Sequence, residues 1–172
     1  MTGDSELREF LKELTSGPIK RPYKEHERII SERPDHSIQV VQLGNPRYVR
    51  TWRFNCHADS FGLTTREEFW ALQETNIEGW ADSRFVALML PTLQPNANPN
   101  LEHLVVYFDE GHHILHSGIG VGDRVVSKWG DGNTYLHSLY ETPASYGSSV
   151  RRYQRPPVDT ALRTYLDWAA TL

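Results

Sequence analysis

The chain has 172 residues, of which 38% are hydrophobic, and a formal net charge of -4; this is the size of one domain with a real core. Lys and Arg are interspersed with acidic residues, so the charge pattern provides no surface for nucleic acid or an anionic membrane, and neither is an expected partner. No apolar run approaches the roughly 18 to 20 residues that cross a bilayer, and residues 1–13 lack the features of a signal peptide. We expect a cytoplasmic protein, with secretion by a leaderless or specialised route left open.

The first 46 residues predict a helix followed by an irregular arm. Between residues 4 and 14, apolar side chains recur at helical spacing and end before Gly17, which predicts a short amphipathic helix. Residues 17–46 carry four prolines, so we expect an arm wrapped around the domain, with one strand at Ser37–Leu43.

A helical half follows the arm. Thr65 and Glu68 have the spacing of a capping box, which predicts a helix over about residues 65–74. A second helix is expected at Ser83–Leu90, before a loop at residues 91–100 that is rich in Pro and Asn.

The pattern then changes to strands. Four are predicted, at residues 104–108, 112–121, 124–129 and 134–140. Their connections are short and turn-like, so consecutive strands should pair as an antiparallel meander. A last amphipathic helix is expected near the end, where Leu162, Tyr165 and Trp168 recur at helical spacing. Arg151 and Arg152, between these segments, either bind a substrate carboxylate or lie at a solvated strand end.

Cys56 is the single cysteine, which excludes an intramolecular disulfide and a Cys-rich zinc site. No metal or organic cofactor is implied. A free cysteine is most often a small buried hydrophobe, but the polar run around Cys56 suits the start of a helical turn. A thiol at such a position becomes a nucleophile when an imidazole lies nearby, and His116 is the candidate imidazole, although an isolated histidine is most often structural.

The predicted hairpin places several residues around His116. If Gly122-Asp123 is a two-residue turn, His116, Gly118 and Gly120 share one face of their strand, and His116 pairs with Trp129. Gly118 then pairs with Ser127, and in the preceding hairpin Val105 pairs with His116, with His103 diagonal to it. Glycine within a strand indicates a close approach, and a packed helix that carries the cysteine would explain both glycines. Ser127, Trp129 and His103 are the candidates for orienting the imidazole, and Trp129 is equally well a core aromatic.

These residues carry a resemblance. The strand at 104–108, a turn, and the run His116-Ser117-Gly118-Ile119-Gly120-Val121-Gly122, downstream of a cysteine, resemble the His-x-Gly-Ile-x-x-Gly hairpin of the NlpC/P60 peptidases. A group of uncharacterised bacterial domains of the same papain-like type is more similar, with Asn-Cys, His-Ser/Ala-Gly, Ser-Lys-Trp-Gly and Tyr-Gly motifs before an aromatic-basic end. The matching residues are Asn55-Cys56, His116-Ser117-Gly118, Ser127-Lys128-Trp129-Gly130, Tyr146-Gly147 and Arg151-Arg152-Tyr153.

The resemblance implies that Cys56 attacks a carbonyl, that His116 acts as general base and then acid, and that a third polar residue holds the imidazole. The usual third position falls near Ser127 or Lys128, and His137 is an alternative. The backbone N–H of Cys56 would hold the oxyanion, helped by the Asn55 side chain or a residue near Trp52. The aspartate that often precedes the cysteine in the family is Asn55 here.

We therefore expect one α+β domain of the papain-like NlpC/P60 type, in which a helix that carries the cysteine packs on an antiparallel β-meander. Residues 1–46 form the N-terminal helix and arm, 47–155 the papain-like core, and 156–172 the C-terminal helix. The expected function is a cysteine hydrolase or acyl-transfer enzyme acting on an amide or peptide bond, with a peptide or protein as substrate. The alternatives are a binding or immunity-type module that keeps the fold without the chemistry, and a structural domain in which Cys56 is inert.

Overall fold

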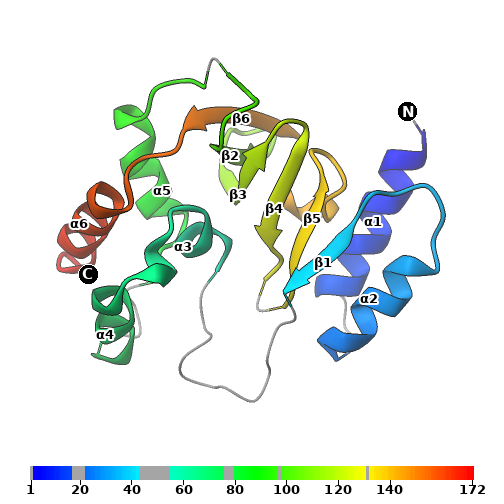
Figure 1. Ribbon diagram of the computed structural model, residues 1–172, viewed down its shortest axis with the longest axis horizontal. Helices are drawn as coiled ribbons and strands as arrows, with labels where there is room; N and C mark the ends of the chain where they lie inside the picture. Colours follow the sequence, from blue (N-terminus) through cyan, green and yellow to red (C-terminus); the bar gives the residue numbers. More distant parts are fainter. Residues whose placement is uncertain (1, 17–21, 43–54, 76–79, 97, 131) are drawn as a thin grey trace.

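The computed structural model describes residues 2–16, 22–42, 55–75, 80–96, 98–130 and 132–172. A six-stranded antiparallel sheet runs through its middle (Figure 1). The strands lie in the order β1 (Gln39–Gln42), β5 (Thr134–Ser138), β4 (Arg124–Lys128), β3 (Ile114–Val121), β2 (His103–Phe108), β6 (Ser149–Gln154). Strands β2 to β5 are the predicted meander, and the exposed Arg151 and Arg152 lie in β6. The chain is therefore α+β, as expected.

Helices cover both faces of the sheet (Figure 1). Those on one side are α1 (Thr2–Ser16) and α2 (Tyr23–Ser31). Those on the other side are α3 (Cys56–Ser60), α4 (Glu67–Thr75), α5 (Ser83–Met89) and α6 (Val158–Ala169). The helices α1, α4, α5 and α6 confirm the sequence predictions to within a few residues, and α3 begins at the cysteine.

Helix α2 contradicts the prediction of an irregular arm. The prolines that suggested irregularity flank the helix rather than interrupt it, since Pro22 is its N-cap and Pro34 lies beyond its end. Proline is tolerated at the start of a helix because the first N–H groups have no partner within it.

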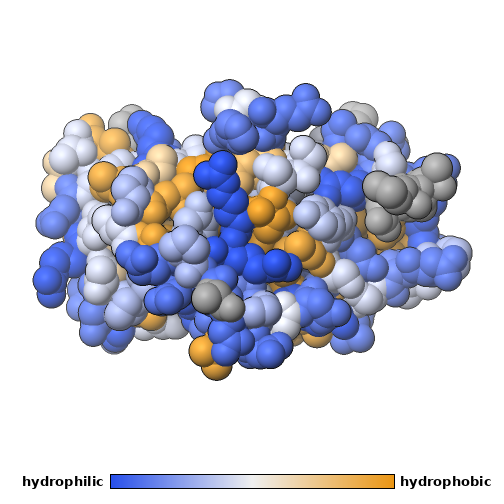
Figure 2. Space-filling view, turned by 90° about the horizontal axis from the view of Figure 1, so that it is seen from above, coloured by the Kyte–Doolittle hydropathy of each residue, from blue (hydrophilic) through white to orange (hydrophobic). Residues whose placement is uncertain are grey.

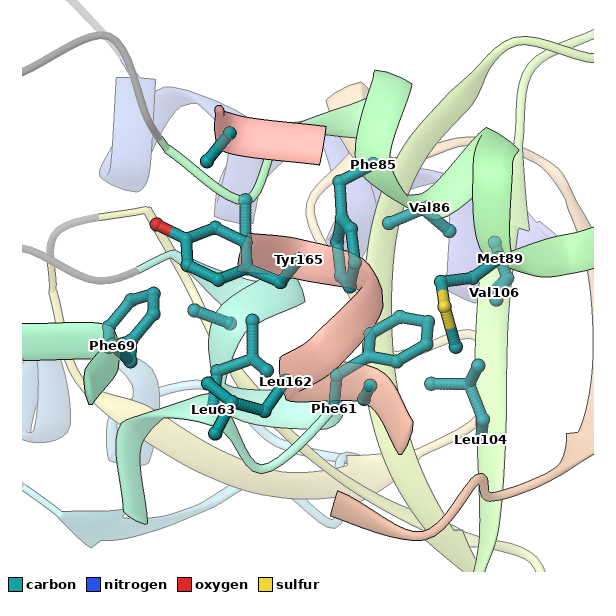
Figure 3. Packing of buried hydrophobic residues seen from close by; sticks show 14 of the residues in the cluster. Phe61, Leu63, Phe69, Phe85, Val86, Met89, Leu104, Val106, Leu162 and Tyr165 are labelled. Atoms are coloured by element: carbon teal, nitrogen blue, oxygen red, sulfur yellow. The ribbon is translucent and has the colours of Figure 1, made fainter. Parts of the chain in front are cut away.

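The main hydrophobic core lies between the sheet and the helices α3, α5 and α6. Alternation along β2 directs Leu104, Val106 and Phe108 into this core. Figure 3 shows the rings of Phe61, Phe85 and Tyr165 filling the space between these elements. Phe61, at the C-cap of α3, makes an edge contact with Phe85 at 5.2 Å between ring centroids. Helix α3 has only five residues, so this burial, rather than its own hydrogen bonds, holds it on the sheet.

A second core lies on the other face of the sheet, where α1 and α2 pack on Trp129 and Tyr135. The surface seen from above is mostly hydrophilic, and its hydrophobic side chains lie in separate small groups (Figure 2). Apolar packing is therefore mainly internal, in two layers that the sheet separates.

The strand register agrees with the prediction in part. Val121 pairs with Arg124 across the Gly122-Asp123 turn, as expected. The pairing ends at Ile119, so the predicted pairs of Gly118 with Ser127 and of His116 with Trp129 do not form. In the other hairpin Tyr107 pairs with His116, not Val105; the predicted register is two residues off because the connection to β3 is longer, with a bulge near Phe108. An even shift preserves the face, so Val105 and His116 still lie on the same side.

The two glycines of β3 have a different cause from the one predicted. A Cβ on Gly118 would come within 2.7 Å of Val125 and 2.9 Å of the Ser127 Cβ, and one on Gly120 would overlap the His103 ring. Neighbouring strands therefore fill the space, and the cysteine-bearing helix packs on the opposite face, in the core with Val106.

The core predicts a contrast between two adjacent residues of α5. Met89 is 1% exposed and Leu88 is 48% exposed. Met89→Ala should lower the free energy of unfolding by about 2–5 kcal/mol, whereas the matched control Leu88→Ala should change it by less than about 1 kcal/mol. Urea denaturation followed by tryptophan fluorescence measures both, and equal losses would contradict the proposed packing of α5.

Candidate active site

Asn55 starts the helix that carries the cysteine. Its extended backbone (φ -100°, ψ 179°) is that of an N-cap, and its Oδ1 accepts from the Ala58 N–H at 2.9 Å. Its Nδ2 donates to the Ala81 carbonyl at 2.8 Å. An aspartate could cap the helix but could not make the second bond. Asn55 thus ties α3 to the segment before α5, and both ends of its side chain are already bonded.

Cys56 lies where β3 and β4 separate. The two strands pair only from Ile119 to Val121, although β4 goes on pairing with β5 as far as Lys128. Counting from the Val121–Arg124 pair, the Ser117 N–H points toward β4, where no residue is paired with it. The backbone N–H groups of Ser117, His57 and Cys56 favour the ionised form of the Cys56 thiol and lower its pKa.

Burial determines the protonation of this thiol. Removal of the sulfur from water raises the pKa of Cys56 to about 11, and the nearby Asp59 carboxylate acts in the same direction. The three N–H donors oppose the rise without cancelling it. Cys56 is therefore a neutral thiol near pH 7.

A chain of hydrogen bonds joins α3 to β3 beside the thiol. His57 Nδ1 lies 2.8 Å from Ser117 Oγ, Ser117 Oγ lies 2.7 Å from Ser60 Oγ, and Ser60 donates to the His57 carbonyl at 3.1 Å. Because the Ser60 hydroxyl donates its one proton to that carbonyl, Ser117 must donate to Ser60 and accept from His57 Nδ1–H. The chain thus leaves His57 Nε2 unprotonated, and burial lowers the pKa of His57 to about 4.

Sequence reasoning missed His57 and Ser60 as partners of Ser117. The signal was their spacing of three residues, which places both on one face of a helix. It could not be used without knowing that this face packs on Ser117 rather than on His116.

His116 is 1% exposed and lies on the face of the sheet opposite Ser117. Its ring is stacked on Tyr146, with centroids 4.0 Å apart and an angle of 15° between the planes, and it lies 5.4 Å from the Tyr107 ring. Its Nε2 is buried without a hydrogen-bond partner among the described residues. Burial, followed by the neighbouring His57 and His137, holds the pKa of His116 well below its usual value.

Cys56 is related to His116 through the neighbouring residue Ser117, and not by a direct bond. One of the amides that lower the pKa of the thiol belongs to Ser117, the next residue after His116. Within the described residues, no hydrogen bond joins the thiol to the imidazole. Both groups are neutral, so they do not form a thiolate–imidazolium pair.

The candidate third members bind one another. Trp129 Nε1 donates to Ser127 Oγ at 3.1 Å, and Ser127 Oγ lies 2.8 Å from His137 Nε2. His137 Nδ1 donates to the Ser138 carbonyl at 2.8 Å, so Ser127 must give its proton to His137 Nε2. Neither residue retains a proton to give to His116, and burial lowers the pKa of His137 to about 4.

The remaining candidates lie apart from His116. His103 lies in β2, four residues before Tyr107, and pairs with Gly120 of β3. The Nδ1 of His103 bonds to the Leu101 carbonyl at 2.9 Å. Lys128 is buried and donates to the Gly132 carbonyl at 2.7 Å. Trp129 is 2% exposed in the core beneath α1. Trp52 lies outside the described residues.

The described residues contain no group of three or more His, Cys, Asp or Glu side chains placed to hold a metal ion. None of the helices in the described ranges combines the length and the apolar character of a membrane span. Comparison of the chain with protein-family models, with curated proteins and with solved structures found no match.

The buried imidazoles predict acid sensitivity. The pKa values of His57 and His137 fall from 6.5 to about 4 on folding, so below pH 6.5 the unfolded chain binds more protons than the folded one. The free energy of unfolding should therefore fall as the pH is lowered from 6.5 to 4, by up to about 1.4 kcal/mol per pH unit for each histidine.

Urea denaturation at several pH values measures this slope. His137→Gln should reduce it, whatever the variant's stability at pH 7, while His112→Asn at an exposed turn with positive φ should leave it unchanged. An identical slope in His137→Gln would show that His137 titrates normally in the folded protein.

Proposed function

We propose that this chain is a papain-like thiol hydrolase or acyl-transfer enzyme, with Cys56 as nucleophile and His116 as its base, acting on an amide bond of a peptide or protein. The observation that carries the proposal is the convergence on β3: the Ser117 backbone lowers the pKa of the Cys56 thiol, and the adjacent His116 has a buried Nε2 with no partner among the described residues. A buried imidazole nitrogen left without a bond costs free energy, which a role in proton transfer would explain.

The chemistry starts from two neutral groups. The S–H bond of Cys56 breaks as an N–H bond forms at His116 Nε2, and the freed electron pair of the sulfur attacks the substrate carbonyl carbon. Because α3 and the His116 ring lie on opposite faces of the sheet, this step requires Nε2 to face the thiol through the opening between β3 and β4. The imidazolium then gives its proton to the leaving nitrogen as the C–N bond breaks, which leaves a thioester on Cys56. Water or another nucleophile cleaves the thioester.

Burial disfavours a charge on Cys56 and on His116. Proton transfer between them is therefore favourable only as negative charge develops on the substrate. The N–H groups of Cys56 and His57, which lower the pKa of the thiol, are the candidate donors for a developing oxyanion. Asn55 contributes by holding the helix start, because its amide is occupied by Ala58 and Ala81. We place the enzyme in the cytoplasm.

A second candidate is a binding module with the same fold and no chemistry. It is favoured by the high pKa of the thiol, about 11, and by the bonding of Ser127 and His137 to each other rather than to His116. In this alternative Cys56 is a half-buried anchor for α3.

Acylation of the single cysteine distinguishes the two. With p-nitrophenyl acetate at pH 7.5, the native protein should release one equivalent of nitrophenolate in a burst and carry an acetyl group on Cys56, detected by mass spectrometry. Cys56→Ala should show no burst. His116→Gln should slow acylation roughly 100-fold or more, the usual contribution of a general base.

The matched control is His112→Asn, which removes an exposed imidazole and should acylate at the native rate. If the native protein acylates only after unfolding, or if His116→Gln acylates as fast as the native protein, the enzyme proposal fails and the binding module remains.

A further inference from the structure

Tyr146 is placed on His116 by a tightly built segment. It ends the 3-10 helix η3 (Ala144–Tyr146), and Gly147 follows with φ at +103°. A Cβ on Gly147 would overlap the Phe108 backbone, and the Ser148 N–H donates to the Phe108 carbonyl at 2.9 Å. Only glycine therefore lets the chain approach the end of β2 this closely, and the approach brings Tyr146 over the sheet.

Helix α1 holds the same segment from the other side. The Arg8 guanidinium donates to the Gly147 carbonyl and, at 3.4 Å, to the Tyr140 carbonyl. Tyr146 also packs against the core that α1 forms with Trp129. The ring of Tyr146 is thus fixed by contacts along the chain on both sides of it, independently of His116.

Within the described part of the chain, the imidazole of His116 has no comparable polar support. Of the residues expected to orient it, Ser127 accepts from Trp129 and donates to His137, and His137 donates to the Ser138 carbonyl. Among the described residues, the closest ring to His116 is the nearly parallel Tyr146 ring, at 4.0 Å between centroids.

We propose that Tyr146 is the positioning residue of His116: its stacked ring fixes the plane of the imidazole and stabilises the imidazolium that forms when His116 takes the Cys56 proton. The inference rests on the proposed function, in which it gives the Tyr-Gly motif a role and replaces the polar third member of the triad. An aromatic face attracts a cation that lies against it, most strongly where water is excluded.

The other groups around His116 do not supply this stabilisation. His57 on α3 and His137 on β5 carry no negative charge, and when protonated they repel a charge on His116 and so lower its pKa. Tyr107 on β2 lies farther away, at 5.4 Å, and at a tilt of 50°. Among the groups named, the Tyr146 ring is therefore the main source of attraction for the charged form.

The test changes the negative charge on the face of the Tyr146 ring while the shape of the ring stays nearly constant. Tyr146→Phe and the same position carrying pentafluorophenylalanine have nearly the same ring size, but fluorination removes the negative face that attracts a cation. Two quantities are measured in each protein: the rate of Cys56 acetylation by p-nitrophenyl acetate, and the pKa of His116 from its NMR titration, with His116→Gln used to assign the signal. Tyr146→Leu removes the ring altogether.

We expect Tyr146→Phe to match the native protein in both quantities. The pentafluorophenylalanine protein and Tyr146→Leu should acetylate roughly 2- to 30-fold more slowly, the range expected for loss of a cation–aromatic contact, and should have a lower His116 pKa. If Tyr146→Leu does not fold, or acid unfolding cuts the titration short, the acetylation rates of the two aromatic proteins decide.

Equal rates in the phenylalanine and pentafluorophenylalanine proteins would overturn the inference, as would a loss in Tyr146→Phe as large as that in Tyr146→Leu, which would assign the effect to the hydroxyl. Failure of the proposed function has a different signature, namely no acetylation of Cys56 in the native protein. In that case the order of the His116 pKa values still decides whether the ring stabilises the imidazolium.

Discussion

The separation of β3 from β4 beyond Ile119 is the feature on which the site depends. A hairpin paired along its full length would give the Ser117 amide to β4, and this amide would then not lower the pKa of the Cys56 thiol. Once the strands part, α3 occupies the opening on one face, anchored by Phe61 in the core and by the Ser60–Ser117 hydrogen bond. His116, one residue earlier, is directed to the opposite face.

Burial gives the site its electrostatic character. The thiol of Cys56 and the imidazoles of His57, His116 and His137 all shift toward their neutral forms, because a charge in the interior loses its hydration. Most of these groups are compensated by hydrogen bonds: His57 bonds to Ser117, and His137 bonds to Ser127. His116 Nε2 is the exception among them, and it is this exception that favours a chemical role.

Strands and most helices were predictable because their signals are local. Alternation along residues 103–138 and the Gly122-Asp123 turn suffice for the meander and for the Val121–Arg124 pair. The β2–β3 register was two residues off because it depends on the conformation of the connecting turn, where His112 adopts a positive φ of 63°, an uncommon state for histidine. Helix α2 was missed because prolines that flank a helix resemble prolines that break one.

By itself, the sequence determined the α+β class, the single thiol and the face of β3 that carries His116, since composition and a period of two are properties of the chain alone. Only the tertiary structure decided the partners: Ser127 and His137 bind each other, Asn55 caps its helix, and Tyr146 covers His116. Hydrogen-bond and ring partners are far apart in the sequence, so they depend on which face α3 covers and on how Gly147 approaches β2, and no local pattern encodes either.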